Sequence, residues 1–248
     1  MNSRDNSRPT IVLVHGAFAD SSGWLGPISR LEREGFTVFA PANPLRGLTS
    51  DADYLRAFLS TVPGPIVLVG HSYGGAVITN AATGNPDVKA LVYINAFALD
   101  EGEPVAAATA LGGGHTELTE HLVVRPFPGA ADGDADAYID PAFFHSLFGQ
   151  DLPPEDEKAL AATQRPASLA TLGTPSGVPA WKSIPSWYLV SAGDRIIPPE
   201  AERFMAARAK ARTVEIDSSH VAMITHPEEV ADLILDAVRT TTRQSVKQ

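Results

Sequence analysis

Cysteine is absent from this 248-residue sequence, and other common features are missing with it. Without cysteine the chain forms no disulfide, uses no thiolate nucleophile and binds no metal through sulfur. No apolar run approaches the ~20 residues of a membrane-spanning helix, so we expect no membrane association. The polar start, residues 1–8, lacks the apolar core of a secretory signal, and this indicates a cytoplasmic protein.

Positive charge is also scarce. The 19 Lys and Arg residues against 29 Asp and Glu residues give a formal net charge of −10. Nucleic acids and anionic membranes repel an acidic surface, so we predict neither as a partner. No phosphate-binding glycine motif follows a predicted strand, and the histidines do not recur at ligand spacing. We therefore predict no nucleotide cofactor and no metal, and we expect a monomer or a homodimer.

Six short runs, most of them almost wholly apolar, alternate with helical patterns along much of the chain. Runs of this kind are typical of parallel strands that are buried on both faces. Between them, apolar residues recur with the helical period of i, i+3 and i+4. The pattern predicts a doubly wound, mostly parallel α/β sheet, which binds ligands beyond the carboxyl ends of its strands. The predicted strands are residues 10–14, 37–40, 66–69, 90–94, 186–190 and 213–216.

Residues 99–182 interrupt this alternation. Between Leu99 and Leu160 we count thirteen acidic residues and only two basic ones. Residues 143–148 and 155–163 have helical spacing, and no strong strand pattern appears. We therefore expect an α/β core formed by residues 1–98 and 183–248, with an α-helical cap, residues 99–182, inserted into it.

The most informative motif is Gly70-His71-Ser72-Tyr73-Gly74, which directly follows the apolar run 66–69. A strand that ends in Gly-x-Ser-x-Gly and continues into a helix is a nucleophile elbow. The serine stands on a sharp turn that projects its Oγ above the sheet. The two glycines leave room where a Cβ would contact neighbouring backbone. Ser72 is therefore the predicted nucleophile.

A serine hydroxyl needs a neighbouring base, which is in turn oriented by a carboxylate. In this kind of site the chain order is serine, acid, histidine. Asp194 and His220 follow the last two predicted strands, and we predict that they are the acid and the base. Asp100, just after the preceding strand, stays open as a rival acid. His226 is the nearest rival base, but it precedes a proline at a predicted helix start.

The negative charge that develops on the substrate oxygen needs two aimed N–H donors. One is the backbone N–H of Tyr73, directly after the nucleophile. The other is expected from the loop after the first strand, residues 15–18, and we predict the N–H of Ala17. These two groups form the predicted oxyanion hole.

Three blocks of the sequence resemble one branch of the α/β-hydrolase superfamily. They are His15-Gly16-Ala17 with Trp24, the elbow at residues 70–75, and Ser219-His220-Val221-Ala222-Met223. That branch contains plant methylesterases, salicylate-binding esterases, hydroxynitrile lyases and many bacterial esterases. The resemblance covers residues 10–98 and 183–240, and the inserted segment has no match.

The resemblance implies the same site: Ser72, Asp194 and His220 as the catalytic triad, with Ala17 and Tyr73 at the oxyanion hole. Two positions depart from the hydroxynitrile lyases. Val221 replaces the lysine that follows the histidine in those enzymes, and Phe18 replaces their threonine, two residues after the glycine of the His-Gly pair. Both changes argue against lyase chemistry.

The sequence therefore predicts a serine hydrolase that acts on a small, uncharged or weakly polar carboxylic ester through an acyl-enzyme. The same triad also serves carbon–carbon bond, thioester and lactone hydrolases, and a ligand-binding protein with slow hydrolysis is a further alternative. The cap would set specificity. We expect the substrate pocket to include Phe18, Phe143, Phe144, Phe148, Trp181 and Val221.

Overall fold

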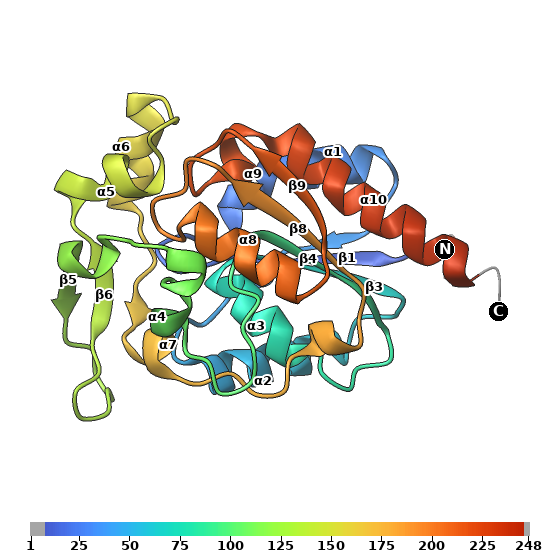
Figure 1. The fold of residues 1–248 in the computed structure, drawn as a ribbon, viewed down its shortest axis with the longest axis horizontal. Coiled ribbons are helices and arrows are strands. Elements are labelled where there is room, and N and C mark those ends of the chain that lie inside the picture. The colour runs from blue at the N-terminus through green and yellow to red at the C-terminus, as the bar shows by residue number, and fades with distance from the viewer. Residues whose placement is uncertain (1–7, 246–248) are drawn as a thin grey trace.

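The computed structural model describes residues 8–245, so most of the polar start of the chain lies outside the described residues. A six-stranded sheet of parallel neighbours, in the order β2-β1-β3-β4-β8-β9, forms the centre of the protein (Figure 1). All six predicted strands are present, and the predicted α/β class is confirmed. The strands are β1 (Thr10–Val14), β2 (Val38–Phe39), β3 (Ile66–Ser72), β4 (Val88–Ala96), β8 (Ser186–Ser191) and β9 (Arg212–Ile216).

The central strands are buried on both faces, as their composition requires. Every residue of β1, β3 and β8 is buried. The side chains of these strands alternate between the two faces, so both faces need a helical cover. The two edge strands differ: β2 has only two residues, and most of β9 is exposed.

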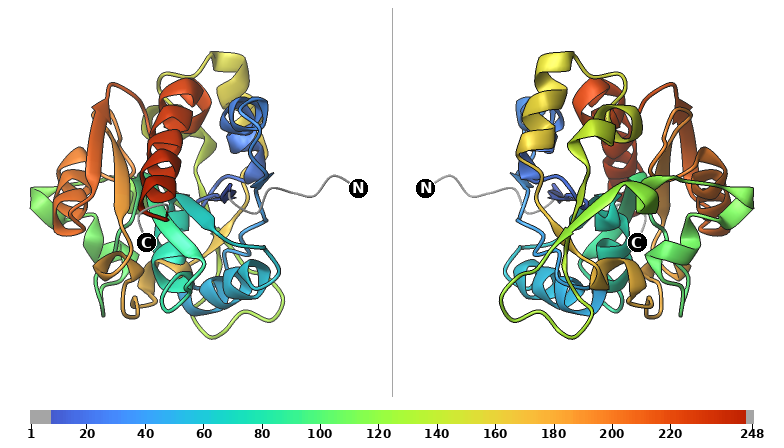
Figure 2. Two further views of the ribbon diagram at one scale, coloured as in Figure 1. Left: turned by 90° about the vertical axis from the view of Figure 1, so that its right-hand side faces the viewer. Right: turned by 90° about the vertical axis from the view of Figure 1, so that its left-hand side faces the viewer.

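Helices supply that cover (Figures 1 and 2). Helix α1 (Leu25–Arg33) packs on α10 (Pro227–Ser245), and α10 packs on β3, β4 and β8. On the opposite face, α2 (Leu48–Leu59) packs on α3 (Tyr73–Ala81), which contacts β3 and β4. Helix α8 (Pro199–Arg208) packs on β8. Within residues 8–245, no helix combines the length and the apolar character that crossing a bilayer requires.

The inserted segment, residues 99–182, contains both helices and strands. Its helices are α4 (Val105–Ala108), α5 (Pro141–Phe148), α6 (Pro154–Ala162) and α7 (Ala170–Gly173). A small antiparallel sheet joins β5 (Leu122–Arg125), β6 (Asp136–Ile139) and β7 (Ala167–Ser168). The segment therefore differs from the wholly α-helical insertion that we expected. Strands of two to four residues are too short to produce a clear periodic pattern in the sequence.

The inserted segment lies beside the loops that follow the strands of the main sheet (Figure 1). The N–H of Phe18, after β1, donates to the carbonyl of Arg165 at 3.1 Å. The N–H of Ser219, after β9, donates to the carboxylate of Asp151 at 2.9 Å. The loops that follow β1 and β9 are thus both hydrogen-bonded to the inserted segment.

Candidate active site

Ser72 ends β3 with a strained backbone conformation, φ 54° and ψ −125°. Such a conformation costs a non-glycine residue on the order of 1–3 kcal/mol. Two flanking glycines make the turn possible. A Cβ on Gly74 would lie 2.3 Å from the carbonyl oxygen of Val14, and one on Gly70 would lie 2.6 Å from the carbonyl oxygen of Gly74. This is the local geometry that the elbow motif predicted.

The loop after β1 lies directly against the serine. A Cβ built on Gly16 would stand 2.6 Å from the Cβ of Ser72, so no side chain fits between them. Ala17 follows, and neither its N–H nor that of Tyr73 donates to a backbone acceptor among residues 8–245. Tyr73 opens α3, where an N–H has no acceptor within its own helix. Neither N–H is therefore committed to a backbone acceptor of the described turns and loops, a condition that the donors of an oxyanion hole must meet.

His220 and Asp194 form a buried pair. Nδ1 of His220 lies 2.5 Å from Oδ2 of Asp194, and both side chains are fully shielded from solvent. A carboxylate at that distance fixes the imidazole tautomer with the proton on Nδ1. Nε2 of His220 is buried and has no hydrogen-bond partner in the described part of the chain. The imidazole thus has one nitrogen committed to the acid and one left to accept a proton.

The other oxygen of Asp194 is held by the backbone. Oδ1 accepts hydrogen bonds from the N–H groups of Ile196 at 2.7 Å and Ile197 at 2.9 Å. The loop after β8 therefore folds back onto its own carboxylate. These two donors orient the Asp194 side chain so that Oδ2 faces His220.

His71 connects the elbow to the histidine loop. Its Nε2 donates to the backbone carbonyl of His220 at 2.8 Å, and the two rings lie 4.7 Å apart. Because His71 directly precedes Ser72, this hydrogen bond joins the loop of His220 to the elbow. Burial lowers the pKa of His71 well below its usual value, so its ring is neutral at pH 7.

The rival residues lie in different surroundings. Asp100 forms an ion pair with Lys182 at 2.7 Å, and this hydrogen bond lowers the pKa of Asp100. His226 shares a hydrogen bond with the hydroxyl of Thr225 at 2.9 Å. In this geometry the acid beside His220 is Asp194.

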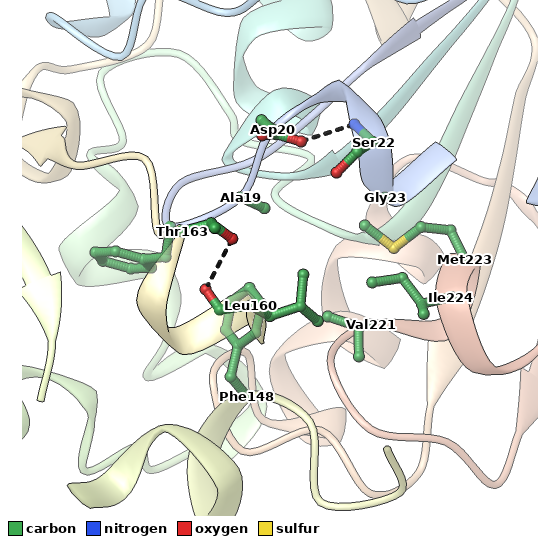
Figure 3. A pocket seen from close by; sticks show the side chains of 11 residues that line it. Ala19, Asp20, Ser22, Gly23, Phe148, Leu160, Thr163, Val221, Met223 and Ile224 are labelled. Atoms are coloured by element: carbon green, nitrogen blue, oxygen red, sulfur yellow. Dashed lines mark hydrogen bonds between the residues drawn. The ribbon is translucent and has the colours of Figure 1, made fainter. Parts of the chain in front are cut away.

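An inner pocket of about 20 Å³ adjoins the site (Figure 3). An outer groove of about 350 Å³ shares five of its lining residues, so the two are neighbouring parts of one path from the surface. Ser72 itself does not line the inner pocket, which is bounded instead by neighbours of Ala17 and His220. The inner pocket is lined by Phe18, Ala19, Asp20, Ser22, Gly23, Phe148, Leu160, Thr163, Val221, Met223 and Ile224.

Half of the predicted pocket residues line this space: Phe18, Phe148 and Val221. Phe148 also meets the ring of His220 edge-on, with 5.3 Å between the ring centres.

The other three predicted residues are placed elsewhere. Phe143, on α5, is 39% exposed and stacks on His121. Phe144 is fully buried and packs on Phe148. The indole N–H of Trp181 donates to the carbonyl of Leu99. Aromatic character in the sequence therefore did not indicate which of these side chains faces the pocket.

Two further positions support the site, and sequence reasoning missed them. The hydroxyl of Tyr73 donates to the buried carboxylate of Asp51 at 2.7 Å, which anchors the residue after the nucleophile. Glu202, on α8, is fully buried beside Asp194. The sequence did contain a signal for the burial of Glu202. Met205 and Ala206 follow it at the i+3 and i+4 positions, and the three residues share the buried face of α8.

No group of three or more His, Asp or Glu side chains in residues 8–245 is arranged to hold a metal ion. A serine hydroxyl, an imidazole with one free nitrogen, a buried carboxylate and two free N–H groups are the components of acyl transfer.

Comparisons with known proteins establish the family and the fold. A family model described as "Alpha/beta hydrolase family" matches residues 11–233. Methylesterase 17 of Arabidopsis thaliana is 28% identical, over 92% of this chain and 91% of its own. A pyrethroid hydrolase of Sphingobium wenxiniae is 27% identical, over 91% of this chain and 86% of its own. The crystal structure of polyneuridine aldehyde esterase has the same fold, with a TM-score of 0.78 at 21% identity over 92% of this chain and 98% of that one.

Proposed function

The chain belongs to the alpha/beta hydrolase family, and we propose that it is a serine esterase that hydrolyses small, uncharged carboxylic esters. The observation that carries this proposal is the state of His220. One ring nitrogen is bound to Asp194 and the other is buried without a partner among residues 8–245. The backbone of His220 is hydrogen-bonded to His71, which directly precedes the strained Ser72. The named activities of the relatives, a methylesterase and a pyrethroid hydrolase, support ester cleavage.

In the proposed mechanism, Oγ of Ser72 attacks the ester carbonyl while Nε2 of His220 takes its proton. The carbonyl oxygen gains negative charge, which the N–H groups of Ala17 and Tyr73 bind. His220 then returns the proton to the departing alcohol, and an acyl-Ser72 ester remains. Water, activated by the same imidazole, attacks the acyl group, releases the acid and restores Ser72. Throughout, Asp194 stabilises the charged form of His220.

The lining of the path favours a neutral substrate. Apolar side chains such as Leu160 and Met223 line both the inner pocket and the outer groove. The charged groups along it are acidic: Asp20 at the inner pocket and Asp156 at the groove. Hydrogen bonding by Ser22 lowers the pKa of Asp20, so this group is a carboxylate at neutral pH. An anionic substrate would meet like charge along the whole path.

The inserted segment is proposed to act as a cap that sets substrate size. The inner pocket holds about 20 Å³, which is room for about one water molecule. Phe148 on α5 and Leu160 on α6 form one side of it (Figure 3). Every carboxylic ester is larger than a water molecule. For an ester to enter the inner pocket, α5 and α6 must therefore move outward, or the side chains of Phe148 and Leu160 must turn away.

Hydrolysis of a p-nitrophenyl ester series from acetate to octanoate tests the proposal. Wild type should turn over the short esters, and Ser72→Ala should abolish that turnover. The chain length with the highest kcat/KM would measure the pocket once it opens. Negligible turnover by a folded wild-type protein would refute the esterase proposal and would favour a carbon–carbon hydrolase or a ligand-binding protein.

A further inference from the structure

Glu202 is a fully buried carboxyl group with incomplete hydrogen bonding. It lies on α8, and its Oε2 accepts the backbone N–H of Ser191 at 2.9 Å. Its Oε1 is buried and receives no donor from residues 8–245. Ser191 links the two acids, because its N–H donates to Glu202 and its carbonyl accepts the N–H of Asp194 at 3.2 Å. The Asp194 carboxylate is the neighbour that acts on the Glu202 side chain through its charge and through hydrogen bonding. The carboxyl groups of Glu202 and Asp194 are therefore neighbours in the solvent-excluded interior.

Two adjacent buried carboxyl groups cannot both be ionised, because their charges repel at short range in a poorly polarisable interior. The number of donors decides which one keeps a proton. Asp194 accepts three N–H groups, from Ile196, Ile197 and His220, and each of these stabilises its charge. Within the described part of the chain, Glu202 accepts only the N–H of Ser191. The proton therefore belongs on Glu202.

The charged and titratable neighbours agree with this placement. Burial, followed by the charge of Asp194, raises the pKa of Glu202 well above its usual value. Arg203 acts in the opposite direction, but it is half exposed and forms an ion pair with Glu215 at 2.7 Å. Tyr188, from β8, is buried nearby, and its raised pKa keeps it neutral.

We propose that Glu202 carries a proton and donates it in a hydrogen bond to Asp194, so that it acts as a positioning residue for the acid of the triad. The inference rests on the proposed function, since it concerns the same site. The O–H of Glu202 shares the oxygen lone pairs of Asp194 with the imidazole N–H of His220. The hydrogen bond from Glu202 orients the Asp194 carboxylate toward His220. Because Glu202 is neutral, it adds no negative charge near the imidazole.

The pH profile of kcat/KM distinguishes a neutral Glu202 from an ionised one. Glu202→Gln keeps the shape, an acceptor for Ser191 and a donor for Asp194. If Glu202 is neutral, this variant keeps kcat within about twofold, and the acidic limb of the profile does not move. If Glu202 is ionised, the variant removes a negative charge next to His220, and the limb moves to lower pH. Such a shift would overturn the proposal.

Glu202→Leu removes the donor. We expect kcat to fall about tenfold or more with KM unchanged, because the variant loses a hydrogen bond to a charged group and such a bond has an energy of that size. The acidic limb should also move to higher pH, because Asp194 then keeps more of its charge for the imidazolium. A folded Glu202→Leu variant with wild-type kcat and an unmoved limb would contradict the positioning role. Glu200→Gln is the matched control, since it makes the same change at an exposed position of α8.

Infrared spectroscopy tests the proton itself and needs no substrate. The difference between wild type and Glu202→Gln at pH 7 should contain the C=O stretching band of an unionised carboxyl group. Carboxylate bands in its place would overturn the proposal, even if Glu202→Leu failed to fold. Because this result does not depend on esterase activity, it separates a failure of the inference from a failure of the proposed function.

Discussion

Replacing Asp194 with Asn turns one oxygen of the buried acid into an N–H donor while keeping its shape. In the wild-type protein one carboxylate oxygen accepts the N–H groups of Ile196 and Ile197, and the other accepts Nδ1 of His220. The two backbone donors require an acceptor, so the amide oxygen of Asn should occupy the first position. The amide NH2 group then faces His220.

That arrangement reverses the tautomer of His220. A donor opposite Nδ1 makes this nitrogen an acceptor and moves the ring proton to Nε2, the nitrogen that must take the proton of Ser72. The imidazole can then no longer act as base. The corresponding change in the well-studied Ser-His-Asp proteases lowers kcat about 10⁴-fold, and we expect a loss of that order, equivalent to about 5 kcal/mol of activation free energy.

The assay is p-nitrophenyl acetate hydrolysis at pH 7.5, with circular dichroism to establish that each variant folds. Asp100→Asn is the matched control: the rival acid is paired with Lys182 at the surface, so this variant should keep near-wild-type kcat. The reasoning would be refuted if folded Asp194→Asn kept more than about a tenth of the wild-type kcat, or if Asp100→Asn lost activity instead.

Three further predictions concern the same site. Tyr73→Phe should lower the free energy of unfolding by about 1–3 kcal/mol, because the buried carboxylate of Asp51 loses a hydrogen-bond donor. The variant should keep kcat within about tenfold, because the predicted oxyanion donor is the backbone N–H of residue 73. Urea denaturation and steady-state kinetics check this, and a 10³-fold loss of kcat would contradict it. Gly16→Ala should lower kcat by about 10²–10³-fold, because the new Cβ would lie 2.6 Å from the Cβ of Ser72 and displace the loop of residues 15–18. Unchanged turnover would mean that this loop is not part of the site. For the wild type, kcat/KM should fall as the pH is lowered, because a protonated imidazole cannot take the proton of Ser72, and a flat profile with chemistry rate-limiting would argue against His220 as the base.

The sequence predicted the main sheet well because the signal for buried parallel strands is local. Runs such as 66–69 are almost wholly apolar, and a strand buried on both faces has this composition wherever it lies in the sheet. The same holds for the elbow, whose glycines are required by contacts with backbone close to Ser72. Local sequence and tertiary structure carry the same information at these positions.

The inserted segment was harder to predict, because its structure depends on distant partners. Strand β7 has two residues and is a strand only through its pairing with β6. Phe143 and Phe148 lie on the same short helix with similar composition around them, but only Phe148 faces His220. Which face of α5 meets the core depends on how the segment packs, and helical periodicity does not specify that.

Glu202 illustrates a different limit. A glutamate in a helix is usually exposed, and the sequence around Glu202 contains several other charged residues. Its burial follows from the position of α8 against β8, which brings it to the backbone of Ser191, eleven residues earlier in the chain. Helical spacing places Glu202 on the buried face of α8, but its neighbours Ser191 and Asp194 are identified only when α8 and β8 are placed in space.

The central claim is that Ser72 forms an acyl-enzyme. Mass spectrometry of the protein quenched during turnover of a p-nitrophenyl ester, followed by tryptic digestion, tests it most directly. Cleavage after Arg56 and Lys89 yields the peptide of residues 57–89, which contains Ser72. The account predicts an acyl adduct on Ser72 in this peptide, and none in Ser72→Ala. An active enzyme whose adduct lies on another residue, or whose Ser72→Ala variant still turns over the ester, would contradict it.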